Sequence, residues 1–318
     1  MSVLVDALRN RFAHDHVITD ELRRLAYGTD GSFYRLIPEV VVVVNDENEV
    51  RGVVELARQH QRTVTFRAAG TSLCGQAVTD GVLVLLGEGL ATCTISADGS
   101  TVQVGPAIIG AEVNRRLAPL GRKIGPDPAS INAAKIGGMA ANNSSGMCCG
   151  TAQNSYNTLA AIRVLLADGT VLDTGDSSSM AAFKISHRSL LERLAALSAD
   201  VRADKALANR IRAKYKIKNT TGYSLNALVD YSDPVDILAH LMIGSEGTLG
   251  FISRVTYQTV PDYAHKASAL AFFPDMESAC RAVVGLKERP VDAVELLDRA
   301  SLRCVAHKPG MPPLLKTL

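Results

Sequence analysis

The sequence predicts a globular α/β protein, and three observations lead to that prediction. Hydrophobic residues make up 47% of the chain and charged residues 21%, which is ordinary for a globular protein with a well-developed core. Five consecutive valines at 40–44 are typical of a strand that is buried on both faces. A helical pattern and a second strand follow, and the chain then enters a glycine-rich segment. The length of 318 residues corresponds to about two domains.

The first elements along the chain form one βαβ unit. Apolar residues at positions 3, 4, 8 and 12 have near-helical spacing and predict an amphipathic N-terminal helix. After the valine strand, Asn45 or Asp46 can cap a helix that ends near His60. A second strand at 63–66 completes a βαβ unit of about 30 residues.

The helices and strands after residue 66 are predicted from turn residues and hydrophobic patterns in the same way. The turn Asp168-Gly169 predicts a hairpin between strands at 161–166 and 170–172. Pro261-Asp262 marks a domain boundary, and a new unit begins at Lys266. The remaining predictions are strands at 81–86, 101–104, 251–260 and 268–273, helices at 111–120, 189–215, 234–243 and 276–287, and an unassigned segment at 291–297 before a last helical piece.

The bulk composition argues against several classes of protein. A net charge of +2 is too small to indicate binding to nucleic acid or to an anionic membrane. No stretch reaches the roughly 18 apolar residues of a membrane span, and Asp6 and Arg9 interrupt any N-terminal signal peptide. The six cysteines lack CxxC spacing, which favours a reducing compartment. We expect a cytoplasmic protein without a transmembrane segment or a nucleic-acid partner.

The segment Arg67–Gln76 follows a predicted strand and is rich in glycine. Gly70 and Gly75 permit positive φ angles, and the hydroxyls of Thr71 and Ser72 can assist backbone N–H groups in forming a nest for phosphate oxygens. The segment matches neither GxGxxG nor a P-loop. Taken alone, it is interpreted equally well as a tight surface loop.

Two further segments also combine glycines with hydrogen-bonding side chains. Residues 136–146 combine paired glycines with Asn and Ser groups, so a backbone can lie against a planar ligand and hydrogen-bond to it. Each segment alone can be an ordinary polar loop, including the third at Gly244–Gly250. Three such segments in one chain indicate a ligand site.

Other motifs favour structural interpretations. The vicinal pair Cys148-Cys149 cannot supply a metal cluster and is predicted to be buried packing. The basic run from Arg210 to Lys218 is interpreted as a solvated helix end or strand, with the alternative that Lys218 and Asn219, together with residues 220–223, face the ligand and attract an anionic substrate. The isolated residues His187, His240 and His265 are predicted to be structural or on the surface.

The segments RAAGTSLCGQ, GPDPASINAAKIGGMAANNSSG and IGSEGTLGFIS, in this order, resemble the FAD-linked oxidase family that shares its flavin fold with vanillyl-alcohol oxidase. The resemblance implies an α+β fold. Residues 38–262 would be a PCMH-type FAD-binding domain of two α/β subdomains, preceded by an N-terminal helical extension at 1–37. Residues 263–318 would be the incomplete beginning of the C-terminal cap domain. SFYRLIPEVVV and KYKIKNTTGYSLNALVDY resemble the D-lactate dehydrogenases that carry a fused iron–sulfur domain.

The resemblance also implies which residues hold the FAD. Thr71 stands where relatives with covalent flavin often have His, so the FAD is expected to be non-covalent. Met139 replaces an Asn that many relatives have after the paired glycines. The implied cofactor-binding residues are Arg67, Ala68, Ala69, Gly70, Thr71, Ser72, Gly75 and Gln76 at the pyrophosphate and ribityl chain, Asp127, Ser130, Gly137, Gly138, Asn142, Ser144, Ser145 and Gly146 along the flavin, and Glu246, Gly247, Gly250 and Ile252 closing the site.

The implied activity is oxidation of a D-2-hydroxy acid, most simply D-lactate, with electrons passing to an acceptor such as a quinone or cytochrome, and the protein could lie peripherally at the inner membrane. The HxGDGNxH and CxxCxxC motifs of such relatives are absent, so ligands for a divalent metal or an iron–sulfur cluster would have to come from a longer chain. We therefore expect this chain to bind FAD without oxidising D-lactate alone, and its catalytic residues stay unassigned. Two alternatives remain: another reaction on the same fold, such as D-2-hydroxyglutarate or glycolate oxidation or a reductase reaction, and a non-catalytic FAD-binding or assembly subunit.

Overall fold

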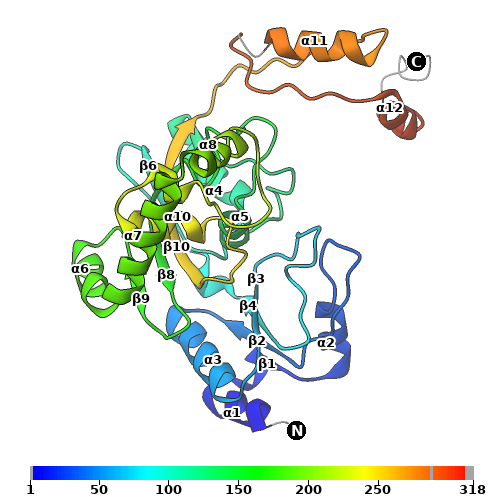
Figure 1. Cartoon of the computed structure of the whole chain (residues 1–318). Coiled ribbons are helices and arrows are strands. Elements are labelled where there is room, and N and C mark those ends of the chain that lie inside the picture. The colour runs from blue at the N-terminus through cyan, green and yellow to red at the C-terminus, as the bar shows by residue number, and fades with distance from the viewer. Residues whose placement is uncertain (1–2, 287–288, 312–318) are drawn as a thin grey trace. The chain divides into compact units, whose positions relative to one another are not determined.

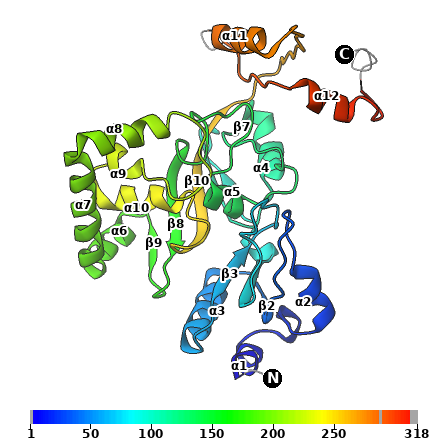
Figure 2. The same ribbon diagram turned by 45° about the vertical axis from the view of Figure 1, so that its right-hand side comes forward.

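A computed structural model describes residues 3–286 and 289–311 of the chain (Figure 1). The chain divides into two compact units, Met1–Tyr263 and Ala264–Leu318. Within these described residues, the first unit contains two sheets and the second contains two helices (Figures 1 and 2). The domain boundary predicted at 262/263 lies next to the division between the units.

The first sheet is mainly parallel and has the strand order β1-β2-β4-β3. The β-branched run of β2 is buried on both faces, as the continuous valines predict. Helices α1 and α3 cover one face, where the apolar residues Leu8 and Val53 meet Val42. The elements are α1 (Val3–Arg11), β1 (Val17–Ile18), α2 (Glu21–Tyr27), β2 (Val40–Val44), α3 (Glu47–Gln59), β3 (Val64–Arg67) and β4 (Val82–Leu86).

Two details of this sheet differ from the sequence predictions. The strands β2 and β3 do not pair with each other, because β4 lies between them and pairs with both in parallel. The N-terminal segment is more than a helical extension, since β1 pairs antiparallel with β2. The N-terminal segment therefore contributes a strand to the first sheet. Three other predictions are confirmed: the N-terminal helix, the α3 cap at Asp46 and the strand at 40–44.

The second sheet is antiparallel and is organised around the long strand β10 (Phe251–Pro261), which pairs with β6, β8 and β7. Tyr257 on this strand is fully buried, and its hydroxyl lies 2.9 Å from the Ser155 hydroxyl. The other strands are β5 (Cys93–Ile95), β6 (Thr101–Val104), β7 (Arg122–Ile124), β8 (Leu159–Leu165) and β9 (Val171–Asp173).

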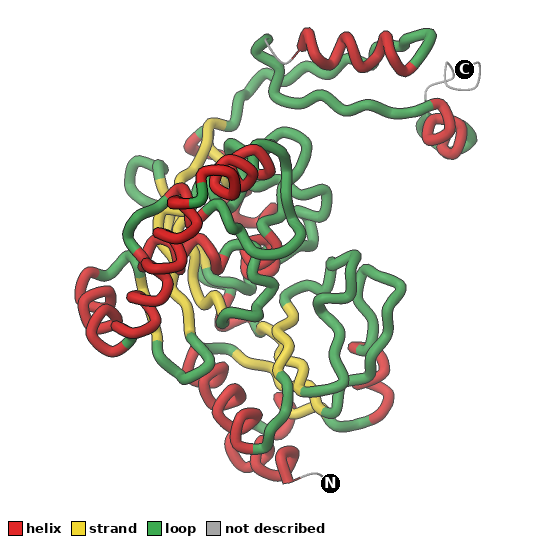
Figure 3. The backbone as a smooth tube through the Cα atoms, viewed as in Figure 1, coloured by secondary structure: helices red, strands yellow, loops and turns green. Residues whose placement is uncertain are grey.

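Helices cover the second sheet and share one apolar core with it (Figure 3). That core includes Val113 of α4, Ile136 of α5 and Ile237 of α10. The helices are α4 (Gly110–Leu117), α5 (Ile136–Asn142), α6 (Ser177–Ser186), α7 (Arg188–Ala203), α8 (Lys205–Lys214), α9 (Ala227–Asp230) and α10 (Pro234–Met242).

The second unit contains α11 (Met276–Leu286) and α12 (Arg299–Val305). The helix predicted at 276–287 is thus present as far as the described residues reach. The strand predicted at 268–273 is wrong: these residues are an exposed loop, and the described part of the second unit offers no strand with which they could pair. Among residues 3–286 and 289–311, no helix is long and apolar enough to cross a membrane.

Candidate functional site

A cleft of about 680 Å³ lies in the first unit and is lined by residues of both sheets. Phe66 and Leu86 come from the carboxyl ends of β3 and β4, and Phe251 comes from the start of β10. All the predicted site residues line this cleft except Arg67, Gly75, Asp127 and Gly146. The ones that line it are Ala68, Ala69, Gly70, Thr71, Ser72, Gln76, Ser130, Gly137, Gly138, Asn142, Ser144, Ser145, Glu246, Gly247, Gly250 and Ile252.

The loop after β3 forms the first wall of the cleft. Gly70 and Gly75 have φ angles of +70° and +79°, as the sequence predicts for a nest. The backbone N–H groups of Ala69, Gly70 and Thr71 find no acceptor among the described residues. This wall therefore presents free donors to the cleft, which is the arrangement that binds anionic oxygens.

Arg67 braces this first wall from behind and does not line the cleft. Its guanidinium donates to the backbone carbonyls of Tyr27, Thr29 and Ala77, over 3.1, 2.6 and 3.4 Å. Burial lowers the pKa of Arg67, with the neighbouring Asp30 acting in the opposite direction. The contact of Arg67 with a pyrophosphate stays a prediction; in the structure its Nη1 atom makes these three hydrogen bonds, and the residue does not line the cleft.

Gly75 is also absent from the lining, because the ring of Tyr34 packs against it. A Cβ atom at Gly75 would lie 2.9 Å from that ring. The segment that contains Tyr34 approaches the loop at a second point, where the Gly31 N–H donates to the Gly70 carbonyl over 2.9 Å. The N-terminal segment thus supports the first wall along its length.

The second wall consists of α5 and the loop that follows it. The sequence predicts a loop for all of these residues, but Ile136–Asn142 is helical and Asn143 ends the helix with a left-handed conformation. Gly137 and Gly138 have different surroundings: a Cβ at Gly137 would lie 2.6 Å from Pro106, whereas a Cβ at Gly138 would meet only Ala68, at 3.4 Å. Gly137 permits close packing, and Gly138 keeps the space opposite the first wall open.

Asp127 braces the second wall and does not line the cleft. Its carboxylate accepts hydrogen bonds from the backbone N–H groups of Gly146, Cys148 and Cys149, over 3.0, 3.0 and 3.2 Å. Gly146 packs against the Asp127 backbone, which leaves no room there for a Cβ. These contacts hold the loop, and the position of the two residues beside a flavin stays a prediction.

The prediction that Cys148 and Cys149 are buried is correct for one of the two residues. Cys149 is buried, as expected, whereas Cys148 is exposed. Burial raises the pKa of the Cys149 thiol to about 11, and the Asp127 charge adds to that effect. Within the described ranges, no group of three or more His, Cys, Asp or Glu residues is placed to hold a metal ion.

The segment Gly244–Gly250 closes the cleft and is joined to the second wall. The Asn142 side-chain amide donates to the Glu246 carboxylate over 2.6 Å, and the Ser144 hydroxyl donates to the Asn142 carbonyl oxygen over 2.8 Å. Glu246 has a φ of +52°, and its N–H donates to the Ala141 carbonyl. Burial raises the pKa of Glu246, with the Asn142 hydrogen bond opposing it. The cleft therefore contains a carboxyl group that retains its proton more readily than an exposed one.

Several residues that line the cleft are not among the cofactor-binding residues that the resemblance implies. Some are the apolar ends of β3, β4 and β10, which the rule that ligands bind at the carboxyl ends of parallel strands could have indicated in part. Lys218 lines the cleft, whereas Arg210 and Arg212 lie exposed on α8. The residues not assigned from the resemblance are Phe66, Leu73, Cys74, Ala77, Leu86, Pro106, Pro128, Ala129, Ala134, Lys135, Met139, Ala141, Lys218, Thr220, Thr221, Gly222 and Phe251.

The histidines predicted to be structural or on the surface do not line the cleft. His187 lies 2.9 Å from the Asp168 carboxylate, and His240 is buried against the ring of Tyr231. Burial lowers the pKa of His240. His265 is exposed in the second unit.

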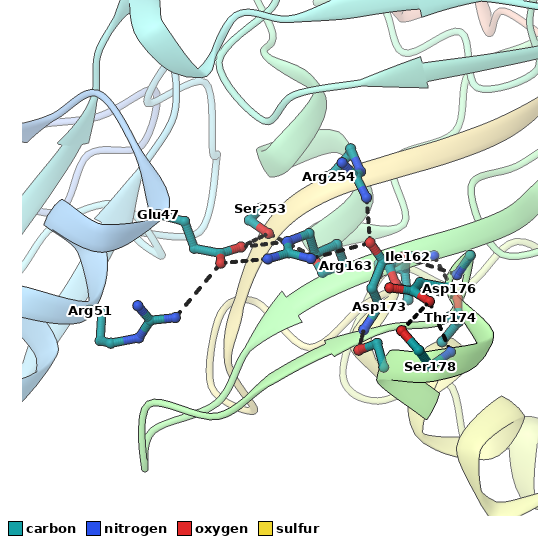
Figure 4. Close-up of polar contacts among 12 residues, drawn as sticks. Glu47, Arg51, Ile162, Arg163, Asp173, Thr174, Asp176, Ser178, Ser253 and Arg254 are labelled. Carbon is teal, nitrogen blue, oxygen red and sulfur yellow. Dashed lines mark hydrogen bonds and ion pairs between the residues drawn. The ribbon is translucent and has the colours of Figure 1, made fainter. Parts of the chain in front are cut away.

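An ion network joins the two sheets of the first unit (Figure 4). Glu47 at the start of α3 accepts from Arg163 on β8 over 2.9 and 3.0 Å and from the Ser253 hydroxyl over 2.7 Å. Arg163 also lies 3.3 Å from Asp173, which pairs with Arg254 as well. Since α3 packs on the first sheet and the other residues belong to the second, this network fixes the two sides of the cleft relative to each other.

The two sheets have separate apolar cores, and residues of both line a glycine-rich cleft. Such an arrangement suits the binding of an extended ligand. Comparison with family models gives that class a name: the FAD binding domain matches residues 38–175, and the C-terminal domain of FAD linked oxidases matches residues 263–317. The chain belongs to the FAD-linked oxidase family.

Three curated relatives have nearly the same sequence identity to this chain, 24–25%. It is 25% identical over 303 residues to glycolate oxidase subunit GlcD of Bacillus subtilis, covering 93% of this chain and 53% of that protein. It is 24% identical to D-2-hydroxyglutarate dehydrogenase of Haemophilus influenzae, covering 81% and 26%, and 24% identical to D-lactate dehydrogenase of Archaeoglobus fulgidus, covering 83% and 48%. The chain therefore spans between about a quarter and about half of these relatives.

Solved structures show the same fold. An alkyldihydroxyacetonephosphate synthase matches with a TM-score of 0.54 and 17% identity, over 81% of this chain and 40% of that chain. The Physcomitrella patens protein BBE-like 1 matches with a TM-score of 0.54 and 14% identity, over 82% and 45%. At such identities the likeness concerns the fold alone.

Proposed function

We propose that this chain binds FAD non-covalently in the cleft and forms the flavin-binding part of a dehydrogenase for a D-2-hydroxy acid, with D-lactate as the first candidate substrate. The observation that carries the proposal is the set of free N–H groups of Ala69, Gly70 and Thr71 at the carboxyl end of β3. The cleft volume of about 680 Å³ also lies within the range of about 300–1,000 Å³ usual for ligand pockets.

The residues of the cleft fit the parts of a flavin dinucleotide. The nest after β3 would hold the pyrophosphate, and Gly138 and Gly247 leave flat backbone surfaces against which a planar ring can lie. Thr71 stands where a covalent link would need a nucleophilic imidazole, which supports non-covalent binding.

The chemistry supplied by a bound flavin is the acceptance of a hydride from the α-carbon of the hydroxy acid. The protein would position the substrate and manage its proton and charge. Lys218 lines the cleft and offers a cation for a substrate carboxylate, while Glu246 and Asn142 form a hydrogen-bonded pair beside the cofactor space. No histidine among the described residues lines the cleft. We propose that the hydroxyl base is supplied from outside this cleft.

The names of the relatives indicate alternative substrates. Glycolate and D-2-hydroxyglutarate are the other substrates to consider, since relatives with those names match to a similar degree. The electron acceptor would be one other than oxygen, such as a quinone or a cytochrome.

Flavin retention tests the proposal directly. The purified chain is mixed with FAD, passed through a desalting column, and examined by absorbance at flavin wavelengths before and after acid precipitation. We expect flavin to stay with the protein on the column and to be released into the acid supernatant. Protein that retains no flavin would refute the proposed function, and flavin that stays with the acid pellet would refute non-covalent binding.

Substrate choice needs a second measurement. The FAD-loaded chain is mixed anaerobically with D-lactate, L-lactate, glycolate or D-2-hydroxyglutarate, and flavin bleaching is followed. We expect no bleaching by this chain, because the base is assigned outside the cleft. Bleaching by L-lactate alone would contradict the proposal.

A further inference from the structure

Lys135 extends from the second side of the cleft to the first. It is the N-cap residue of α5, and its ammonium donates to the Leu86 carbonyl at the end of β4 over 2.9 Å. Both residues line the cleft. The backbone around Lys135 is held in place, because the N–H groups of Ile136 and Gly137 donate to the carbonyls of Ile108 and Pro106, each over 2.9 Å.

The register of the first sheet shows where this ammonium lies relative to the phosphate nest. Strands β3 and β4 are parallel, with Arg67 opposite Leu85. Leu86 is therefore level with Ala68, the residue that leads into the loop with the free N–H groups. Neighbouring strands are about 4.8 Å apart, so the ammonium lies about one strand spacing from the start of that loop.

The charge of Lys135 has no partner of opposite sign among the residues that the structure describes. Among the described residues, Lys135 makes no ion pair with a carboxylate. An ammonium has three N–H donors, and the Leu86 carbonyl accepts one of them. A half-buried cation with unused donors is stabilised when an anion binds beside it.

We propose that Lys135 binds the pyrophosphate of the dinucleotide, together with the N–H groups of the loop after β3. This assignment rests on the proposed function and deepens it. The loop supplies neutral donors from the first sheet, and Lys135 supplies the positive charge from the second. The bound pyrophosphate would then join the two sides of the cleft at the carboxyl ends of β3 and β4.

The variant Lys135→Gln tests the proposal, because glutamine keeps a donor for the Leu86 carbonyl while removing the charge. Binding of FAD and of riboflavin is measured by titration of flavin fluorescence at low and at high salt. A charged hydrogen bond to phosphate corresponds to roughly a tenfold or greater change in affinity. We expect Lys135→Gln to weaken FAD binding at least about tenfold at low salt, to reduce the salt dependence of binding, and to leave riboflavin binding unchanged.

Two control variants separate the charge of Lys135 from its contribution to packing and from the general positive charge of the protein. Lys214→Gln removes an exposed lysine of α8 that does not line the cleft, and we expect its FAD affinity to stay within about twofold of wild type. Lys135→Arg should restore most of the FAD affinity. If Lys135→Gln unfolds, Lys135→Arg and Lys135→Met give the same comparison of charged and uncharged side chains.

The outcomes distinguish this inference from the function on which it rests. Wild-type protein that binds no FAD would overturn both. Wild-type protein that binds FAD, with Lys135→Gln within twofold of it, would overturn only the assignment of Lys135. An equal loss of FAD and riboflavin binding would also overturn it, since riboflavin has no phosphate and the lysine would then act on the shape of the cleft.

Discussion

The two glycine-rich walls of the cleft are braced from behind by residues of opposite charge. Behind the first wall, the Arg67 guanidinium binds three backbone carbonyls. Behind the second, the Asp127 carboxylate binds three backbone N–H groups. Neither charged group lines the cleft. In each case, a charged side chain that does not line the cleft forms hydrogen bonds with backbone polar groups.

The difference between the walls concerns which backbone groups are left for a ligand. Arg67 binds carbonyls, and the N–H groups of Ala69, Gly70 and Thr71 in the first wall have no acceptor among the described residues, which suits an anion. Asp127 binds N–H groups, and the second wall presents side chains such as Asn142 and Ser144 to the cleft.

Arg67→Met gives the largest expected effect and breaks the brace of the first wall. Three carbonyls lose a charged donor, and we expect the free energy of unfolding to fall by about 2–3 kcal/mol. Urea unfolding measures the change. Arg62→Met, which removes a surface ion pair with Glu39 and one long hydrogen bond to the His60 carbonyl, is the matched control and should have a smaller effect. Equal losses in the two variants would contradict the bracing role.

Asp127→Asn breaks the brace of the second wall. The amide group presents a donor to at least one of the three N–H groups, and we expect a loss of about 1–2 kcal/mol of stability. The Cys149 pKa should also fall from about 11, because the Asp127 charge that helps to raise it is removed.

Thiol labelling as a function of pH provides the second readout for this variant. Cys149 should react more readily and at lower pH in Asp127→Asn than in wild type. Asp98→Asn is the control, since Asp98 also accepts a backbone N–H but lies in an exposed turn far along the chain. Unchanged labelling of Cys149 in Asp127→Asn would show that the loop keeps its structure without the carboxylate.

Glu47→Gln acts on the connection between the walls and has the smallest expected effect. Burial alone would raise the pKa of Glu47, but hydrogen bonds from Arg163 and Ser253 outweigh burial and hold the pKa below its ordinary value of 4.5. A carboxylate with a lowered folded-state pKa contributes stability above its unfolded-state pKa, and that contribution is lost as the pH falls through the folded-state pKa. We expect a loss of about 1–2 kcal/mol at neutral pH.

The pH dependence checks the cause of this loss. The difference in unfolding free energy between wild type and Glu47→Gln should shrink as the pH falls below 4.5. Glu55→Gln on the same helix removes an exposed ion pair with Arg11 and should change stability less. A pH-independent difference would mean that packing, rather than the charge of Glu47, joins the two sides.

Local patterns are sufficient to predict most elements of the first unit. The valine strand, the α3 cap at Asp46, the hairpin turn at Asp168-Gly169 and the long strand from Phe251 all depend on neighbouring residues in the sequence. The predictions at β2 and β3 are less complete, because sequence shows that two strands exist but not that β4 pairs between them. The strand expected at 268–273 fails since strands require partners, and none lies in the described part of the second unit.

The sequence by itself determined where the glycine-rich loops lie, which family they resemble, and about half of the residues that line the cleft. Only the tertiary structure decided the direction of the charged side chains. Arg67 and Asp127 lie in motifs that imply ligand contact, yet neither lines the cleft, while Lys135, to which no role is assigned from the sequence, does. The physical reason is that a charged group takes the partner that the fold places within reach, and those partners come from segments distant in sequence.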